Sequence, residues 1–173
     1  IACAFDDEIQ YALEGSIFVT GDSIEWLMND LKLIDELADA KYYASKVAST
    51  EGLYVVPAFL GLGAPYWDPT ATGAMFGLTR KTTKAHIIRA VLESIAYRTK
   101  DVLDAMDNDS GISSQQLKAD GQYSENSFLM QFQSNIIGKE LHVSRDINGA
   151  SRGAAYLAGI GTGIWNKSDI NEL

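Results

Sequence analysis

Cysteine and histidine are scarce in this sequence. Cys3 is the single cysteine among 173 residues, so the chain can form neither an internal disulfide bond nor a cysteine-based zinc site. The two histidines, His86 and His142, are too few for a metal site built from imidazoles. The acidic run at residues 6–8 is interpreted as a solvated turn rather than a site for a divalent ion. No metal ligand is therefore assigned within the chain.

Long hydrophobic runs and an excess of positive charge are also missing. No apolar segment approaches the roughly 20 residues of a membrane-spanning helix, so no membrane span is predicted. The chain has 14 lysines and arginines against 23 aspartates and glutamates, which gives a net charge of −9. A surface of this charge argues against binding to nucleic acid. The 46% of hydrophobic residues is ordinary for a globular domain with a buried core.

The strongest periodic signal predicts a helix from Lys84 to about Met106. Apolar residues recur every three or four positions, which is typical of a helix with one buried face. Thr83 precedes the segment as a candidate cap, and Gly111 follows it as a stop signal. The positions predicted to face water are Arg89, Glu93, Lys100 and Asp104.

Turn-forming residues divide the rest of the chain into shorter segments. Helices are predicted at residues 24–34, 35–49, 126–137 and 150–160. Strands are predicted at residues 11–20, 53–59, 74–78, 117–119 and 141–143. Strands that alternate with helices of this length indicate an α/β domain with helices packed on the faces of a sheet.

Glycine stands at two junctions where an open α/β sheet would bind a ligand. Gly21 opens the helix that carries Glu25, and Gly121 lies between a strand and the following helix. Helix N-termini at such junctions present free backbone N–H groups, which suit an anion such as a nucleotide phosphate. On the residues alone, a turn or capping role for these glycines is the simpler explanation. Neither junction matches the dinucleotide-binding pattern or the P-loop.

Several segments together resemble the C-terminal domain of the FGGY family of carbohydrate kinases. The resemblance is carried by residues 11–15, 21–27, 54–69, 73–93, 128–133 and 153–159. Gly-Ala-Met-Phe-Gly-Leu at 73–78, followed after seven residues by His-Ile-Ile-Arg, is similar to a signature of the family. Ala-Pro-Tyr-Trp-Asp-Pro at 64–69 and Phe-Leu-Met-Gln-Phe-Gln at 128–133 favour members that phosphorylate glycerol over kinases of xylulose, gluconate or ribulose.

The resemblance implies an actin/hexokinase-like ATPase fold, in which two ribonuclease-H-like α/β domains with mixed sheets close on a cleft. It implies ATP-dependent phosphorylation of glycerol to glycerol 3-phosphate, with residues 1–173 as the C-terminal, ATP-side domain. Ile1 is not a methionine. We therefore expect an N-terminal polyol-binding domain to precede the chain and to supply the catalytic aspartate, the glycerol contacts and the ligands of Mg²⁺.

The same resemblance implies ATP and ADP as ligands, a cytoplasmic location and a homo-oligomeric full-length protein. Because the catalytic aspartate is expected upstream, we expect no kinase activity from the isolated chain. Two alternatives remain open. The chain could be the domain of another FGGY sugar kinase, or a non-catalytic module that binds nucleotide or serves as an interaction surface.

The nucleotide contacts implied by the resemblance fall on Gly21, Glu25, Gly121, Gln122 and Asn126. Three of these match the family pattern, with glycine at 121 explained by close approach of the backbone to the ligand. Glu25 replaces a usual glutamine, and Gln122 replaces a usual glycine. We hypothesise that these two changes weaken ATP binding, and drift at a tolerant site is the competing explanation. No catalytic residue is assigned within the chain.

Overall fold

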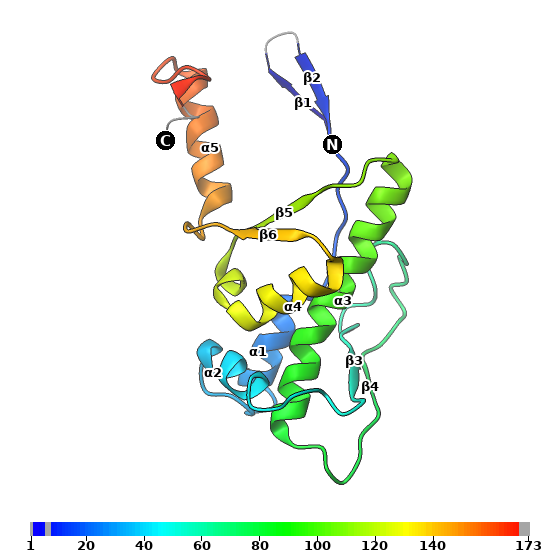
Figure 1. Cartoon of the computed structure of the whole chain (residues 1–173). Helices are drawn as coiled ribbons and strands as arrows, with labels where there is room; N and C mark the ends of the chain where they lie inside the picture. Colours follow the sequence, from blue (N-terminus) through cyan, green and yellow to red (C-terminus); the bar gives the residue numbers. More distant parts are fainter. Residues whose placement is uncertain (1, 6–7, 170–173) are drawn as a thin grey trace.

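The computed structural model describes residues 2–5 and 8–169, and Asp6 and Asp7 of the predicted acidic turn lie outside them. The described residues form an α/β structure of helices and small sheets (Figure 1). The strands are β1 (Ala2–Phe5), β2 (Glu8–Tyr11), β3 (Tyr54–Val56), β4 (Ala74–Phe76), β5 (Gln116–Ala119) and β6 (Glu140–Val143). The helices are α1 (Gly21–Asn29), α2 (Leu37–Ala44), α3 (Lys84–Ser110), the 3₁₀-helix η1 (Gln122–Glu125), α4 (Ser127–Ile137) and α5 (Gly149–Gly161). Among these described helices, none combines the length and the apolar character needed to cross a membrane.

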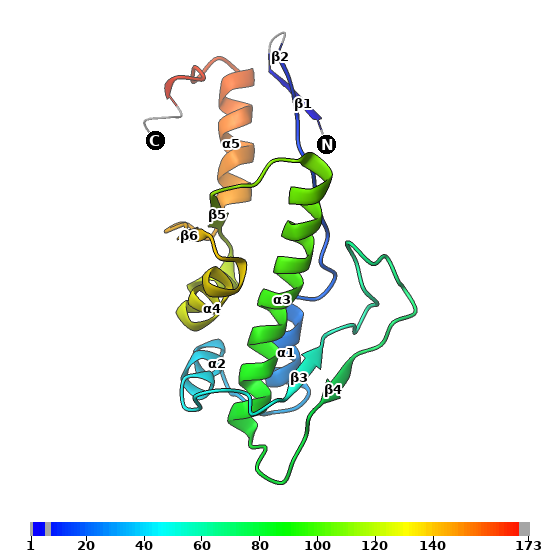
Figure 2. The ribbon, with the colours of Figure 1, turned by 45° about the vertical axis from the view of Figure 1, so that its right-hand side comes forward.

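Helix α3 is the long central element of the fold (Figures 1 and 2). Helices α1, α2 and α4 and strand β3 all pack against it. Its buried side chains, among them Ile88 and Leu92, form one core with Leu27 of α1. The predicted start is confirmed, because the N–H of Thr83 donates to Nδ1 of His86 at 3.1 Å. The helix continues past the predicted end near Met106 as far as Ser110, and it stops at the predicted Gly111, which adopts the left-handed conformation.

Two of the four positions predicted to face water are covered instead. Arg89 Nε donates to Glu93 Oε1 at 2.7 Å, and these two side chains are only 15% and 8% exposed. The Arg89 guanidinium also lies 5.1 Å from the centre of the Phe128 ring, which belongs to α4. The prediction is confirmed for Lys100 and Asp104, whose side chains are 40% and 55% exposed. Polar residues on one helix face look alike in a sequence, whether water or another helix covers them.

The strands do not assemble into the one mixed sheet that the family resemblance implies. Those in the described residues form three two-stranded sheets, with β1–β2 and β3–β4 antiparallel and β5–β6 parallel. Residues 12–20, predicted as part of a strand, are not in one. Gly15 in this segment lies against α3, where an added Cβ would come within 2.4 Å of Val102 Cγ1. The segment therefore follows the helix surface, and the β1–β2 hairpin lies apart from β5 and β6 (Figure 1).

Helix α2 ends at Ala44, although the sequence predicts a helix over residues 35–49. The carbonyl oxygen of Val47, inside the predicted range, accepts a hydrogen bond from the Arg89 guanidinium of α3. A tertiary contact thus satisfies this carbonyl, which would be one of the last four of a helix ending at residue 49 and would have no partner within that helix. Local propensity cannot reveal such a partner, because the donor lies 42 residues away in the sequence.

The predicted strand at residues 53–59 is also shorter than expected and keeps only Tyr54–Val56. Pro57 follows directly and has no backbone N–H to donate to a neighbouring strand. The partner strand β4 ends where Gly77 adopts a φ of +87°, and a Cβ there would lie 2.0 Å from the carbonyl oxygen of Gly52. Backbone geometry at both ends therefore limits this hairpin to three residue pairs.

Candidate functional site

The predicted site residues lie on two segments that are distant in sequence and adjacent in the fold. The hydroxyl of Tyr123 donates to Glu25 Oε1 at 2.6 Å, although these residues are 98 positions apart. This bond joins the first turns of α1 to the turn before α4. The predicted residues are Gly21 and Glu25 in α1, and Gly121, Gln122 and Asn126 in the turn that contains η1 and leads into α4.

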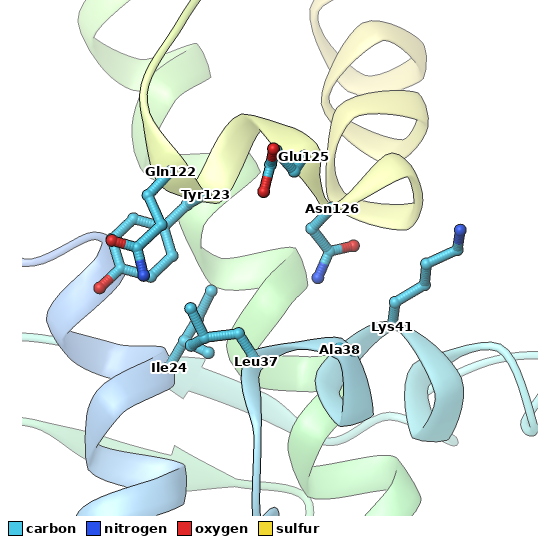
Figure 3. Close-up of a pocket in the computed structure, with 8 residues that line it drawn as sticks. All are labelled: Ile24, Leu37, Ala38, Lys41, Gln122, Tyr123, Glu125 and Asn126. Carbon is cyan, nitrogen blue, oxygen red and sulfur yellow. The ribbon is translucent and has the colours of Figure 1, made fainter. Parts of the chain in front are cut away.

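A cavity of about 280 Å³ lies where α1, α2 and the η1 turn meet (Figure 3). Its residues combine an apolar floor with a polar rim. They are Ile24, Leu37, Ala38, Lys41, Gln122, Tyr123, Glu125 and Asn126. Binding sites for small molecules start at about 300 Å³ and pair a largely apolar surface with a few polar groups. At about 280 Å³ the cavity lies just below that range, and its lining has the same mixture of apolar and polar groups.

Two of the five predicted residues, Gln122 and Asn126, line this cavity. Gly21, Glu25 and Gly121 are not in the lining of the cavity. Glu25 is connected to the cavity only indirectly, because it accepts a hydrogen bond from Tyr123, which does line it. Sequence reasoning missed Tyr123 and Lys41 as site residues. The large aromatic side chain of Tyr123, directly after the predicted contacts, was an available signal. Lys41 gave none, because nothing in the sequence places α2 beside η1.

Asn126 is oriented by the helix that it caps. Its Oδ1 accepts the backbone N–H of Leu129 at 3.1 Å, which satisfies one of the free donors at the start of α4. Because the carbonyl oxygen serves the cap, the amide nitrogen is turned toward the cavity (Figure 3). An amide NH₂ group can only donate, so Asn126 offers hydrogen bonds to acceptor atoms of a ligand.

Two glycines in this region are required for different physical reasons. Gly121 has a φ of +93°, a backbone conformation that residues with a side chain rarely adopt. An added Cβ at this position would meet nothing within 4 Å. Its backbone conformation alone therefore explains glycine. At Gly21 the reason is contact, because an added Cβ would lie 1.8 Å from Cε2 of Tyr123. The Tyr123 ring thus packs directly on the backbone of α1 at Gly21, in the space that a side chain would otherwise occupy.

The environment of Tyr123 stabilises its neutral form. Burial of the phenol is the largest cause, followed by the hydrogen bond to Glu25 and by the negative charges of Glu25 and Asp22. Together they raise the pKa of Tyr123 from 10.0 to about 12. The Tyr123 hydroxyl is therefore a donor to a carboxylate over the whole physiological pH range.

This raised pKa predicts a loss of stability in alkali. Below pH 10 the Tyr123 phenol is protonated in both the folded and the unfolded chain, so its contribution to folding is fully present. Between pH 10 and about 12 the unfolded chain loses the proton first, and the free energy of unfolding should fall. Denaturant titrations at stepped pH should show a steeper fall for the wild type than for Tyr123→Phe. Identical slopes would contradict the assignment.

Metal binding has no support in the described part of the chain. There, no group of three or more histidine, cysteine, aspartate or glutamate side chains is placed to hold a metal ion. Asp22 and Glu25 both lie in α1 near the candidate site, but Glu25 is engaged by the Tyr123 hydroxyl. We therefore assign no metal ligand to these residues.

The cavity lies beside the glycine-containing starts of two helical segments in an α/β domain, and comparison with known proteins defines the class of protein. Residues 4–162 match the FGGY family of carbohydrate kinases, C-terminal domain. The chain belongs to this family, and the resemblance seen in its sequence segments is confirmed.

Within the family, the chain is similar to glycerol kinases. It is 54% identical over 173 residues to the glycerol kinase of Natranaerobius thermophilus, and the alignment covers 100% of this chain and 35% of that protein. It is 54% identical over 169 residues to the glycerol kinase of Escherichia coli K12, with 98% of this chain and 34% of that protein covered. The chain thus spans about a third of the length of these curated relatives.

Solved structures show the same relationship. The structure of Plasmodium falciparum glycerol kinase with ADP matches with a TM-score of 0.84 at 39% identity, covering 95% of this chain and 32% of that one. A ligand-bound xylulose kinase from Lactobacillus acidophilus matches with a TM-score of 0.81 at 24% identity, covering 96% of this chain and 34% of that one. The second match shows that the fold is shared across sugar kinases of different substrates.

Proposed function

We propose that this chain is the ATP-side, C-terminal domain of an enzyme that transfers the γ-phosphoryl group of ATP to glycerol and forms glycerol 3-phosphate. The observation that carries the proposal is the 54% identity to a glycerol kinase over all 173 residues. Another FGGY sugar kinase is less well supported, because the similar xylulose kinase is only 24% identical. The match to a glycerol kinase solved with ADP supports a nucleotide as the ligand of this domain.

The proposal includes the domain organisation. Residues 1–173 form one ribonuclease-H-like domain of an actin/hexokinase-like enzyme, and an N-terminal domain binds the polyol. The 35% coverage of the similar Natranaerobius enzyme leaves room for such a domain. We further propose a cytoplasmic location for the full-length protein, since ATP is an intracellular phosphoryl donor. From the family resemblance, we also propose that the full-length protein is a homo-oligomer.

We assign nucleotide contacts to Gly21, Glu25, Gly121, Gln122 and Asn126. The cavity beside them is of a size and character that suits the base of the nucleotide. Its apolar floor packs on the faces of a ring, and the Asn126 amide donates to an acceptor at the ring edge or on the ribose. The rest of the nucleotide then extends past η1 toward the start of α1.

The chemical role of this domain is to hold and orient the phosphoryl donor. Phosphoryl transfer depends mainly on positioning and on stabilisation of charge. The glycerol hydroxyl oxygen forms the new bond to the γ-phosphorus as the bond to ADP breaks, and a carboxylate of the N-terminal domain takes the hydroxyl proton. Mg²⁺ bound with ATP neutralises phosphate charge, and its protein ligands belong to the N-terminal domain in this proposal. No catalytic residue is assigned to this chain.

Calorimetric titration of the 173-residue chain with ADP tests this assignment. We expect saturable ADP binding, no binding of glycerol, and no ADP release from ATP and glycerol in a coupled assay. Asn126→Asp is the matched variant, because aspartate still caps α4 but has no amide donor. It should lower the ADP affinity about 10-fold or more, since a donor is replaced by a carboxylate.

The controls separate a binding defect from a folding defect. Asn126→Asp should unfold at the same denaturant concentration as the wild type, because the cap to Leu129 is retained. Equal ADP affinity in both proteins would overturn the role of Asn126. Absence of ADP binding by the wild type would count against the nucleotide assignment, and turnover above a heat-killed control would show that this domain contains its own catalytic group.

A further inference from the structure

Tyr123 spans the space between the two segments that carry the proposed nucleotide contacts. Its backbone belongs to η1, next to Gly121 and Gln122. Its ring lies on α1, where a Cβ at Gly21 would come within 1.8 Å of Cε2 and 2.4 Å of Cδ2. Its hydroxyl donates to Glu25 Oε1 at 2.6 Å. One side chain thus contacts both walls of the site.

We propose that Tyr123 and Glu25 form a latch that closes the nucleotide site of this chain, and that a nucleotide must open it to bind. The inference rests on the proposed function, because it concerns the same site. Gly21 has no side chain, so its backbone is the part of α1 that a ligand can approach most closely. The Tyr123 ring already covers that backbone. A ligand and the ring cannot both contact Gly21.

The charge on Glu25 makes the latch resistant to opening. A hydrogen bond to a carboxylate is stronger than one between neutral groups, and it is lost when the Tyr123 side chain rotates away. The released carboxylate then joins Asp22 as a negative charge at the start of α1. Both charges repel the phosphates of a nucleotide. Two costs therefore lower the affinity for a nucleotide. The hydrogen bond between Tyr123 and Glu25 is lost, and the uncovered Glu25 charge repels the phosphates.

The latch can open without movement of the η1 backbone. Tyr123 also lines the cavity of about 280 Å³, and in Figure 3 its ring stands at one end, beside Gln122. Rotation of the side chain away from Gly21 leaves the η1 backbone where it is, because Ser124 Oγ and the Asn126 N–H keep their own bonds to Gly121 and Tyr123 carbonyl oxygens. The latch thus opens through one side chain.

Calorimetric titration with ADP of five proteins tests the latch. They are the wild-type chain and the variants Tyr123→Phe, Tyr123→Ala, Glu25→Gln and Tyr156→Phe. Tyr123→Phe keeps the ring but not the hydroxyl, and should bind ADP about 10-fold more tightly. Tyr123→Ala also uncovers Gly21 and should bind more tightly still. Glu25→Gln removes the charge and should fall between wild type and Tyr123→Ala.

Tyr156→Phe is the matched control. Tyr156 lies in α5, where its ring packs on Trp165 at 5.7 Å between ring centres, so its variant should bind ADP like the wild type. The proposal is overturned if neither Tyr123 variant gains affinity. Weaker binding by Tyr123→Ala also overturns it, because the ring would then be a wall on which the ligand stacks.

The same titrations distinguish failure of the latch from failure of the proposed function. If the wild type and all variants bind ADP equally, the latch is wrong and the nucleotide site stands. If none of them binds ADP, including Tyr123→Ala with Gly21 uncovered, the nucleotide assignment is wrong and the latch falls with it. Should Tyr123→Ala fail to fold, Tyr123→Phe and Glu25→Gln decide the outcome, since both retain the size of the native side chain.

Discussion

Replacement of Arg89 by methionine should lower the free energy of unfolding by about 3 kcal/mol. The variant leaves the Glu93 carboxylate, whose side chain is 8% exposed, without the guanidinium that pairs with it at 2.7 Å. It also removes the donor to the Val47 carbonyl oxygen and the cation above the Phe128 ring. Methionine fills much of the volume of arginine, so the loss comes from the unpaired Glu93 charge and from these two missing contacts rather than from a cavity.

Chemical denaturation followed by circular dichroism measures this effect, and the same helix supplies the control. Lys100 and Asp104 have the same spacing as Arg89 and Glu93, but their side chains are 40% and 55% exposed. Lys100→Met should therefore cost less than about 1 kcal/mol. The double variant Arg89→Met/Glu93→Met should recover the part of the stability that the unpaired charge costs, although the contacts of Arg89 with Val47 and Phe128 stay missing. A loss for Arg89→Met no larger than for Lys100→Met would contradict the argument.

Truncation of Leu92 to alanine should cost about 3 kcal/mol of unfolding free energy, within the range for leucine truncations in cores. The Leu92 side chain is fully buried, with 0% of its surface exposed, and belongs to the core that α3 shares with its neighbours. The cost combines lost burial of apolar surface with the cavity left behind. Because α1, α2 and α4 all pack on α3, the cavity left by the truncation weakens the support of these three helices.

Leu157 in α5 is the matched control for this truncation. Its side chain is 58% exposed, so Leu157→Ala should change the free energy of unfolding by no more than about 0.5 kcal/mol. Both variants are compared by thermal and denaturant unfolding with ADP absent, which keeps binding from masking the difference. Equal losses for the two leucines would show that α3 is not the centre of the fold.

The sequence predicted those features that depend on local pattern. The long helix with Thr83 at its start and Gly111 at its end was predictable, because capping and periodicity are read from neighbouring residues. The coverage of Arg89 and Glu93 was not, since it depends on α2 and α4 packing on the same face. Strand pairing was also beyond the sequence. Residues 12–20 have strand-like composition, but the contact of Gly15 with α3 takes them away from any ladder.

The candidate site was predictable to a similar extent. Family resemblance pointed to five residues, and the structure brings them onto two adjacent segments. It did not indicate that Tyr123 would bond to Glu25, because that contact joins positions 98 residues apart. It also gave no reason to expect Lys41 in the cavity lining. Contacts between distant segments depend on the packing of whole helices, which no local pattern records.

The shared support of α1, α2 and α4 by α3 has a consequence for rates. Helices α1 and α4 both pack directly against α3, and η1 in turn contacts α4. Opening at Gly21 then involves rotation about the side-chain bonds of Tyr123 and loss of its hydrogen bond to Glu25, so it should be slower than the picosecond to nanosecond rotations of exposed side chains. In the proposed latch, the rate of nucleotide exchange should therefore depend on how often the Tyr123 side chain leaves Gly21.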